Sequence, residues 1–226
     1  MEKKYSLLMS LILAVGLSFI VYFDNEKIVS YSKDNIPEYN GESYIYLNDN
    51  IPDFDEKLIN TNSFESYSEL DYLGRSGIAL ANIGTDLMPV TERESIGSIK
   101  PSGWKTIKYD FIDGKYLYNR CHLIGYQLTG ENKNEKNLIT CTRNMNANVM
   151  LKFENEIAEY IHKTSNHVLY RVTPYYENDN LLASGVELEA LSVEDNGEGI
   201  KFNVYIYNVQ DGITIDYKTG KSKKDE

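Results

Sequence analysis

Alternating hydrophobic and polar residues dominate the C-terminal half of the chain and predict β-strands there. Three such runs cover residues 167–176, 181–190 and 200–209, and Asn, Asp and Gly residues separate them. A period of two places successive side chains on opposite faces of a strand, and short polar separators are typical of hairpin connections. The three runs therefore predict an antiparallel meander.

A helical pattern precedes this meander. Apolar residues recur at helical spacing within residues 146–162, at Val149, Met150, Phe153, Ile157, Tyr160 and Ile161. This spacing predicts an amphipathic helix with one side on a core. Nearer the N-terminus, residues 44–47 predict a short strand that stops at the polar residues 48–50. The pattern predicts an α+β fold, an antiparallel sheet with flanking helices.

The N-terminus contains a long segment without charge. Lys3 and Lys4 precede residues 5–23, none of which is charged. A basic start before such a stretch is typical of a signal peptide or a membrane anchor, and it disfavours a buried core helix. No small-x-small cleavage pattern closes the segment, which favours an uncleaved anchor. We therefore expect residues 1–23 to be a signal peptide or membrane anchor, and the protein to be extracytoplasmic, either membrane-anchored or secreted.

Polar segments bound the folded part of the chain. Residues 24–42 have a mixed polar composition without a sustained period, which predicts a tether. Residues 219–226 are mostly charged and predict a disordered tail. One folded domain over residues 43–218 remains, and a chain of 226 residues with 42% hydrophobic residues can bury one sizeable core.

Charge is distributed unevenly along the chain. The formal net charge of -11 argues against a polyanionic partner, because Lys and Arg supply most of the affinity for phosphates. However, residues 99–152 contain nine basic and four acidic residues, which gives this segment a formal charge of +5. The positive charge is concentrated in one region, and this permits a phosphate-binding surface there.

The basic segment also contains a strand, loop, strand and helix in that order. If residues 116–122 are extended, Arg120 and His122 project from the same face, about 6.6 Å apart at roughly 3.3 Å per residue. A turn-rich loop then leads to residues 137–140, which predict a second, antiparallel strand, and the helix follows from Asn146. This order brings His122, Asn137, Asn146 and Glu154 within reach of one another.

This stretch resembles the DNA/RNA non-specific endonuclease family, whose signature is Asp-Arg-Gly-His followed by spaced asparagines and a glutamate. Here residues 119–122 read Asn-Arg-Cys-His. Asn137 precedes an Ile-Thr pair, Asn146 lies nine residues further on, and Glu154 follows after eight more, as in the family pattern. Several motifs that agree in order and spacing form a specific signal.

The resemblance extends over about residues 44–218. Residues 73–89 and 101–132 are similar to exported, DNA-entry-type nucleases of Gram-positive bacteria. Two positions depart from the family signature, since Asn119 replaces Asp and Cys121 replaces Gly. The first change puts local hydrogen bonding in doubt, and the second implies that the backbone there need not adopt a positive φ.

The resemblance implies a ββα-metal endonuclease that hydrolyses DNA, with RNA as a second substrate. Phosphodiester hydrolysis needs an activated water, neutralisation of the phosphate charge and help for the leaving oxygen. His122 is the candidate general base and Asn146 the ligand of Mg²⁺, for which Mn²⁺ can substitute, and Glu154 would bind a water of the ion. Arg120 is the candidate phosphate clamp and Asn137 orients the site. The candidate nucleic-acid-binding residues are Arg143, Lys133 and Lys136.

Other interpretations of these residues remain open. Asn146 would otherwise be a helix cap, and Glu154 a solvated helix residue. Arg143 could pair with Glu135 instead of phosphate. Trp104 is more typical of a packing anchor than of a base-stacking platform.

His162 and His167 flank the predicted helix end and strand start, where surface roles are expected. An alternative function is a membrane-anchored DNA-binding protein with a degenerate nuclease fold, although this does not explain the spacing of His122, Asn137, Asn146 and Glu154. A zinc hydrolase is disfavoured because it needs three or four His, Cys or carboxylate ligands. No obligate protein partner is implied.

Cys121 and Cys141 fall on the two strands of the predicted site. A bridge between them would close a loop of about twenty residues in an oxidising compartment. The geometric demands of a disulfide and the small size of cysteine favour the other interpretation, in which each residue is a small buried hydrophobe.

Overall fold

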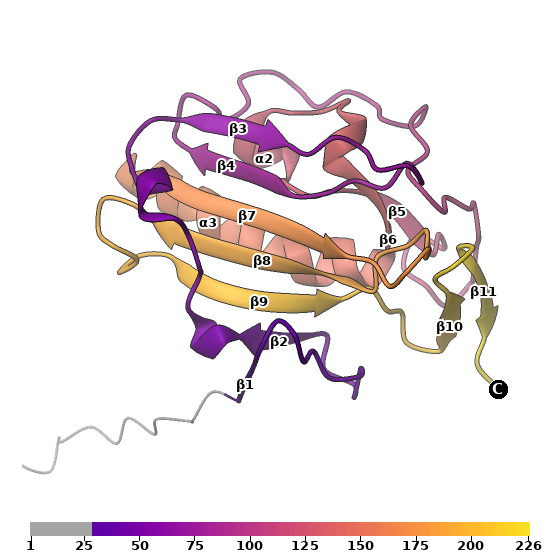
Figure 1. Ribbon diagram of the computed structural model, residues 1–226. Coiled ribbons are helices and arrows are strands. Elements are labelled where there is room, and N and C mark those ends of the chain that lie inside the picture. The colour runs from indigo at the N-terminus through magenta and orange to yellow at the C-terminus, as the bar shows by residue number, and fades with distance from the viewer. Residues whose placement is uncertain (1–28) are drawn as a thin grey trace, which may run out of the picture.

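The computed structural model describes residues 29–226, in which a large sheet carries a long helix on one face (Figure 1). The expected signal or anchor segment, residues 1–23, lies outside the described residues. Within residues 29–226, no helix combines the length and the apolar character needed to cross a membrane.

Seven strands form the main sheet. They are β1 (Ser30–Tyr31), β2 (Tyr44–Leu47), β3 (Phe64–Tyr67), β4 (Ala79–Ile83), β7 (Val168–Tyr175), β8 (Gly185–Ser192) and β9 (Lys201–Tyr207). Their order is β1-β2-β9-β8-β7-β4-β3, and every neighbouring pair is antiparallel except β1 and β2. The strand at residues 44–47 and the C-terminal meander are confirmed, whereas β3 and β4 carry no alternation that predicted them.

A second, two-stranded sheet leads into the long helix. β5 (Tyr118–His122) pairs antiparallel with β6 (Leu138–Thr142), with His122 opposite Leu138 and Arg120 opposite Thr140. A π-helical segment, η4 (Met145–Met150), then continues into α3 (Leu151–Thr164). This is the expected strand, strand and helix order, and the α+β class is confirmed.

The start of this helix differs from the expectation. The Thr142 hydroxyl accepts a hydrogen bond from the Met145 amide at 3.1 Å, which is the geometry of a helix N-cap. Helical residues therefore begin before Asn146, and interpreting Asn146 as the cap is wrong. π-helical turns are rare and frequently occur at functional sites.

The core lies between α3 and the main sheet. Phe153, Ile157 and Ile161 form the buried side of α3, and they belong to one cluster with Tyr170 and Phe202 of the sheet. The rings of Phe153 and Phe202 are 5.0 Å apart. Because apolar burial is the main favourable term in folding, this contact fixes the position of α3 and of the residues at its start.

Short helices and a C-terminal hairpin complete the fold. The short helices are η1 (Asn48–Asn50), η2 (Glu56–Leu58), α2 (Tyr126–Thr129) and η3 (Glu135–Asn137). β10 (Ile213–Asp216) and β11 (Lys221–Lys224) pair antiparallel at the end of the molecule that holds β5 and β6 (Figure 1). The expectation of a disordered tail is therefore wrong, because the charged residues of β11 are exposed while their backbone pairs with β10.

The segment expected to be a tether is partly packed on the domain. β1 pairs with β2, the Tyr207 hydroxyl donates to the Pro37 carbonyl at 2.9 Å, and Tyr39 contacts the Tyr207 ring edge-on. Lys33 lies 3.4 Å from the buried carboxylate of Glu187. The folded part thus begins near residue 30, and the tether interpretation is wrong for residues 30–39.

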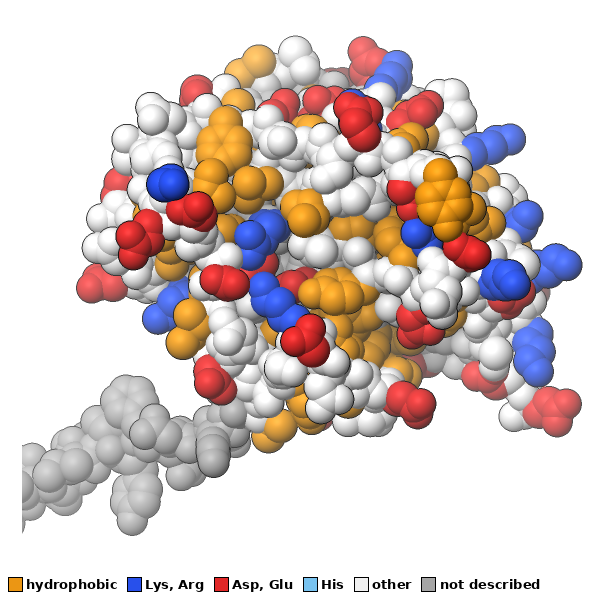
Figure 2. All heavy atoms as spheres, viewed as in Figure 1, with side chains coloured by type: hydrophobic (Ala, Val, Ile, Leu, Met, Phe, Trp, Pro, Cys, Tyr) orange, Lys and Arg blue, Asp and Glu red, His pale blue; other side chains and the backbone are white. Residues whose placement is uncertain are grey.

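The outer face of the main sheet, opposite α3, carries many acidic groups. Figure 2 shows Asp and Glu side chains scattered over this face, together with Lys and Arg side chains and with hydrophobic and neutral ones. Such a distribution agrees with the acidic balance of the chain outside residues 99–152.

A disulfide joins Cys121 of β5 to Cys141 of β6. Their Cα atoms are 5.9 Å apart, within the usual range for a bridge, and both residues are fully buried. The interpretation as two free, small hydrophobes is therefore wrong. Cys121 does not adopt a positive φ, which agrees with the expectation drawn from the replacement of glycine by cysteine.

Candidate active site

Two adjoining cavities form a groove beside β5 and the start of the long helix. The first, of about 460 Å³, is lined by His122 and Glu154 and is called the catalytic section. The second, of about 510 Å³, is lined by Trp104 and Arg120 and is called the flanking section. Arg93, Arg143 and Asn146 line both sections, so the two are parts of one groove.

His122 lies at the end of β5 and is only 6% exposed. Its Nε2 is 2.9 Å from the carbonyl oxygen of Asn132, and its Nδ1 is 3.2 Å from a guanidinium nitrogen of Arg93. A carbonyl can only accept, so Nε2 carries the proton and Nδ1 has the free electron pair. Burial lowers the pKa of His122 to about 4; the Asn132 hydrogen bond opposes this shift and the Arg93 charge adds to it.

Arg93 is a site residue that the sequence did not indicate. It lies in a segment without regular structure between β4 and β5, and its neighbours show no periodic pattern. Its guanidinium contacts His122 and lines both sections of the groove. Only the fold reveals this role, because the Arg93 loop reaches His122 across 29 residues of sequence.

Glu154 lies in the first turn of α3 and is 8% exposed. Burial raises the pKa of this carboxyl to about 8, although the Gly125 amide and the Arg93 charge lower it. Gly125 permits this close approach, since a Cβ there would lie 2.5 Å from Oε2 of Glu154. Glu154 is thus a buried carboxylate in the groove, and the interpretation as a solvated helix residue is wrong.

Asn146 lies in the π-helical segment and is half-buried in the wall shared by the two sections. Within the described residues, no hydrogen bond occupies its side-chain amide. The amide oxygen is therefore available to a ligand in the same cavity as His122 and Glu154.

Asn137 is fully buried and positions the backbone after His122. Its Oδ1 accepts from the Ile124 amide at 2.9 Å, and its Nδ2 donates to the Ile124 carbonyl at 3.0 Å. The Asn137 carbonyl also accepts from the Leu123 amide at 2.9 Å. Asn137 does not line the groove, so its position fits the orienting role rather than contact with a substrate.

Arg120 does not share a cavity with His122. Its guanidinium lies over the Trp104 ring, 3.9 Å from the centroid, and donates to the carbonyls of Gly97 and Ile99. Trp104 itself packs against a small hydrophobic cluster, as expected for a packing anchor. Arg120 therefore lines the section of the groove that adjoins His122, and Arg93 is the arginine that contacts the His122 ring.

The other basic residues divide into two groups. Arg143 lines both sections and pairs with Asp113 at 2.9 Å, not with Glu135. Lys133 pairs with Glu94 and Lys136 pairs with Glu69, and neither lysine lines the groove. The structure therefore brings Arg143 to the site and leaves the two lysines outside it.

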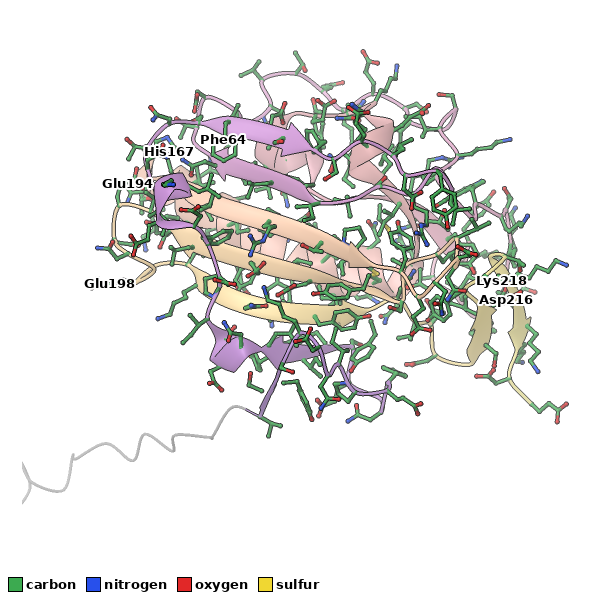
Figure 3. The ribbon with its side chains drawn as sticks, in the orientation of Figure 1. Phe64, His167, Glu194, Glu198, Asp216 and Lys218 are labelled. Atoms are coloured by element: carbon green, nitrogen blue, oxygen red, sulfur yellow. A yellow bond between two sulfur atoms is a disulfide. The ribbon has the colours of Figure 1, made fainter. Side chains whose placement is uncertain are left out.

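The remaining histidines lie away from the groove. His162 is exposed near the end of α3. His167 donates through Nδ1 to the Glu194 carboxylate at 2.7 Å, and Figure 3 shows this pair at the end of the sheet opposite the β10 and β11 hairpin. Both residues have the surface positions that were expected.

The sequence profile of the DNA/RNA non-specific endonuclease family matches residues 56–194, more than half of the chain. The chain belongs to this family. The protein is accordingly a nuclease that hydrolyses nucleic acid, and the match contains all the residues expected to line its site.

Solved structures of nucleases share the fold. NucA from Streptococcus agalactiae without metal is 24% identical, with a TM-score of 0.74 over 86% of this chain and 92% of that one. The same nuclease with a bound magnesium ion is 24% identical, with a TM-score of 0.68 over 79% and 85%. Sda1 nuclease with a bound zinc ion is 29% identical, with a TM-score of 0.59 over 70% and 79%.

Proposed function

We propose that the chain is a Mg²⁺-dependent, sugar-non-specific endonuclease that cuts DNA and RNA with His122 as general base. The observation that carries this proposal is the catalytic section, where His122, Asn146 and Glu154 line one cavity together with Arg93 and Arg143. A base, oxygen ligands for a cation and two arginines are the groups that phosphodiester hydrolysis needs.

His122 is suited to accept a proton through Nδ1. The Asn132 carbonyl fixes the proton on Nε2, and the low pKa keeps the ring neutral at physiological pH. Water in the groove then attacks phosphorus while Nδ1 takes its proton. The bond from phosphorus to the leaving oxygen breaks, and that oxygen gains a proton from solvent.

The residues of the catalytic section fit a hydrated divalent cation. Glu154 is a buried carboxyl group whose pKa is raised by burial, and the Gly125 amide and the Arg93 charge offset this shift only in part. A cation bound beside it would favour its ionised form. Asn146 offers an amide oxygen, and Mg²⁺ retains several waters and needs few protein ligands. When bound, the cation would neutralise charge that develops on the phosphate.

The small number of protein ligands supports Mg²⁺ as the metal. Among residues 29–226, no group of three or more His, Cys, Asp or Glu side chains could hold a metal. Zinc sites in hydrolases usually have three such ligands, whereas Mg²⁺ is bound through one or two oxygens and water. This favours Mg²⁺, with Mn²⁺ as a substitute.

The arginines are suited to bind the phosphate. Arg93 and Arg143 line both sections of the groove, so a phosphodiester beside His122 would meet both guanidinium groups. Arg93 contacts Nδ1 of His122 and must turn from it before that atom can accept a proton.

The uncharged segment at residues 5–23 after Lys3 and Lys4 supports an extracytoplasmic location.

Digestion of matched single- and double-stranded DNA and RNA tests the proposal. We expect the purified protein to cut all four in Mg²⁺, to stop in EDTA and to recover when Mg²⁺ or Mn²⁺ is added. Because EDTA alone does not distinguish Mg²⁺ from Zn²⁺, add-back of each metal is the deciding arm. Recovery with Zn²⁺ alone, or binding without cleavage, would contradict the proposal.

A further inference from the structure

We propose that the flanking section binds the nucleobase next to the scissile phosphate, with the guanidinium face of Arg120 as its stacking surface. The inference rests on the proposed function, since it takes the phosphate to lie beside His122. Three guanidinium groups line the flanking section, from Arg93, Arg120 and Arg143. Its volume of about 510 Å³ is in the range of small-molecule sites and can hold a base with its sugar.

Arg120 is held in a way that suits stacking better than phosphate binding. Two of its nitrogens donate to the carbonyls of Gly97 and Ile99, and its Cζ lies over the Trp104 ring, 3.9 Å from the centroid. These contacts use part of the in-plane donor set and fix the side chain. Arg120 lines the flanking section, and bases stack readily on guanidinium planes.

The loop that carries Trp104 is held by the body of the protein. The Ser102 hydroxyl donates to the Leu181 carbonyl at 2.7 Å, and the Ser102 carbonyl accepts from the Thr140 hydroxyl at 2.8 Å. Gly103 and Gly220 approach so closely that a Cβ on Gly220 would overlap the Gly103 carbonyl. The C-terminal hairpin therefore supports this loop, and the stacking surface is formed before a ligand binds.

The rim of the flanking section is aromatic and basic. Tyr116 lines the cavity and is 45% exposed, so part of its ring is open to a ligand. The Lys108 ammonium lies 4.5 Å from the centre of its ring. An exposed aromatic ring beside basic side chains is typical of surfaces that bind unpaired nucleotides through base stacking and phosphate contacts.

The flanking section is continuous with the catalytic section, where hydrolysis is proposed to occur. Because Arg93, Arg143 and Asn146 form the wall between the two sections, a phosphate bound there has its neighbouring nucleotide in the flanking section. A base that stacks on Arg120 must leave its own helical stack, which costs less in a single strand than in a duplex. The section therefore favours unpaired substrate at this one position.

Cleavage of end-labelled single-stranded DNA that contains one abasic position tests this inference. With the full-length protein in Mg²⁺, we expect cutting at the phosphodiester on one side of the abasic position to fall by about 5- to 100-fold, the range of one base stack. The other phosphodiesters of the same strand are the internal control. Equal cutting at all positions would overturn the inference while leaving the proposed function intact, whereas no cutting anywhere would contradict the proposed function.

Two variants assign the effect to the named residues. Arg120→Lys keeps the charge and removes the planar face. It should therefore slow cutting of the normal strand and abolish the decrease in cutting beside the abasic position. Tyr116 is exposed, so Tyr116→Leu should fold normally and should make the decrease in cutting beside the abasic position smaller. If Arg120→Lys slows normal and abasic positions equally, Arg120 binds phosphate and the inference is wrong. A melting curve confirms that each variant is folded. If Arg120→Lys does not fold, Tyr116→Leu still tests the inference.

Discussion

A guanidinium nitrogen of Arg93 lies 3.2 Å from Nδ1 of His122, the ring nitrogen that has the free electron pair. The Asn132 carbonyl holds the other ring nitrogen at 2.9 Å, so both nitrogens have partners within the protein. A cation at Nδ1 disfavours protonation of the ring, and it also occupies the place that an attacking water needs. Substrate phosphate is the group that can draw Arg93 away.

Removing Arg93 should raise the pKa of His122. In Arg93→Ala we expect the ring to titrate above the value of about 4, because a positive charge is lost, while burial keeps it below that of an ordinary histidine. Cleavage should slow as well, since the phosphate loses a ligand. NMR titration of the imidazole resonances measures the shift, with His162 and His167 as internal references. An unchanged His122 titration would show that Arg93 does not contact the ring in solution.

Replacing Glu154 should stabilise the metal-free protein and inactivate the enzyme. A carboxyl whose pKa is raised to about 8 contributes stability below its unfolded pKa, and this contribution is lost as the pH rises through 8. In EDTA, the free energy of unfolding of Glu154→Gln should therefore increase relative to that of the wild type as the pH rises from 5 to 8. The expected change is on the order of 1–3 kcal/mol. Thermal melts of both proteins at pH 5 and pH 8 measure this difference in stability. A stability advantage of the variant that shrinks as the pH rises would contradict the prediction.

Asn146→Ala should raise the Mg²⁺ concentration needed for half-maximal cleavage by about tenfold or more and lower the maximal rate, because it removes an oxygen ligand. Asn148→Ala is the matched control. Asn148 is exposed in the same π-helical segment, and its amide donates only to Asn144, at 3.0 Å. A Mg²⁺ titration that moves equally in both variants would exclude Asn146 as a ligand.

Reduction of the bridge between Cys121 and Cys141 should destabilise the domain. The bridge spans 20 residues, for which the chain-entropy model gives about 3 kcal/mol. The oxidised protein should be two hydrogens lighter than the reduced protein by mass spectrometry, and reductant should lower its melting temperature. Two thiols that alkylate freely in native, air-exposed protein would refute the bridge and leave the nuclease assignment unaffected.

The sequence predicted the parts of the site that a local pattern encodes. β5 and β6 follow from two short runs on either side of a turn-rich loop, the long helix follows from helical spacing, and His122, Asn146 and Glu154 follow from the family signature. Contacts across the fold left no such pattern. Arg93 reaches His122 from an irregular loop, and Asn132 acts through a backbone carbonyl that any residue possesses.

Charge also misled the sequence-based predictions in two places. Lys133 and Lys136 belong to the basic segment, but each pairs with a glutamate from outside that segment, Glu94 or Glu69. The charged residues of β11 indicated disorder, yet the strand forms because its backbone pairs with β10 and its neighbour Gly220 packs on Gly103. A count of charges along the chain does not reveal which charges meet in three dimensions.

The cleavage rate of His122→Ala at saturating DNA and Mg²⁺, measured with its DNA affinity, tests the central claim most directly. Loss of the proton acceptor should lower the rate by about 10²- to 10⁴-fold. Affinity and melting temperature should stay close to those of the wild type, and added imidazole should restore part of the rate. A folded variant that cuts within tenfold of the wild-type rate would contradict His122 as the general base.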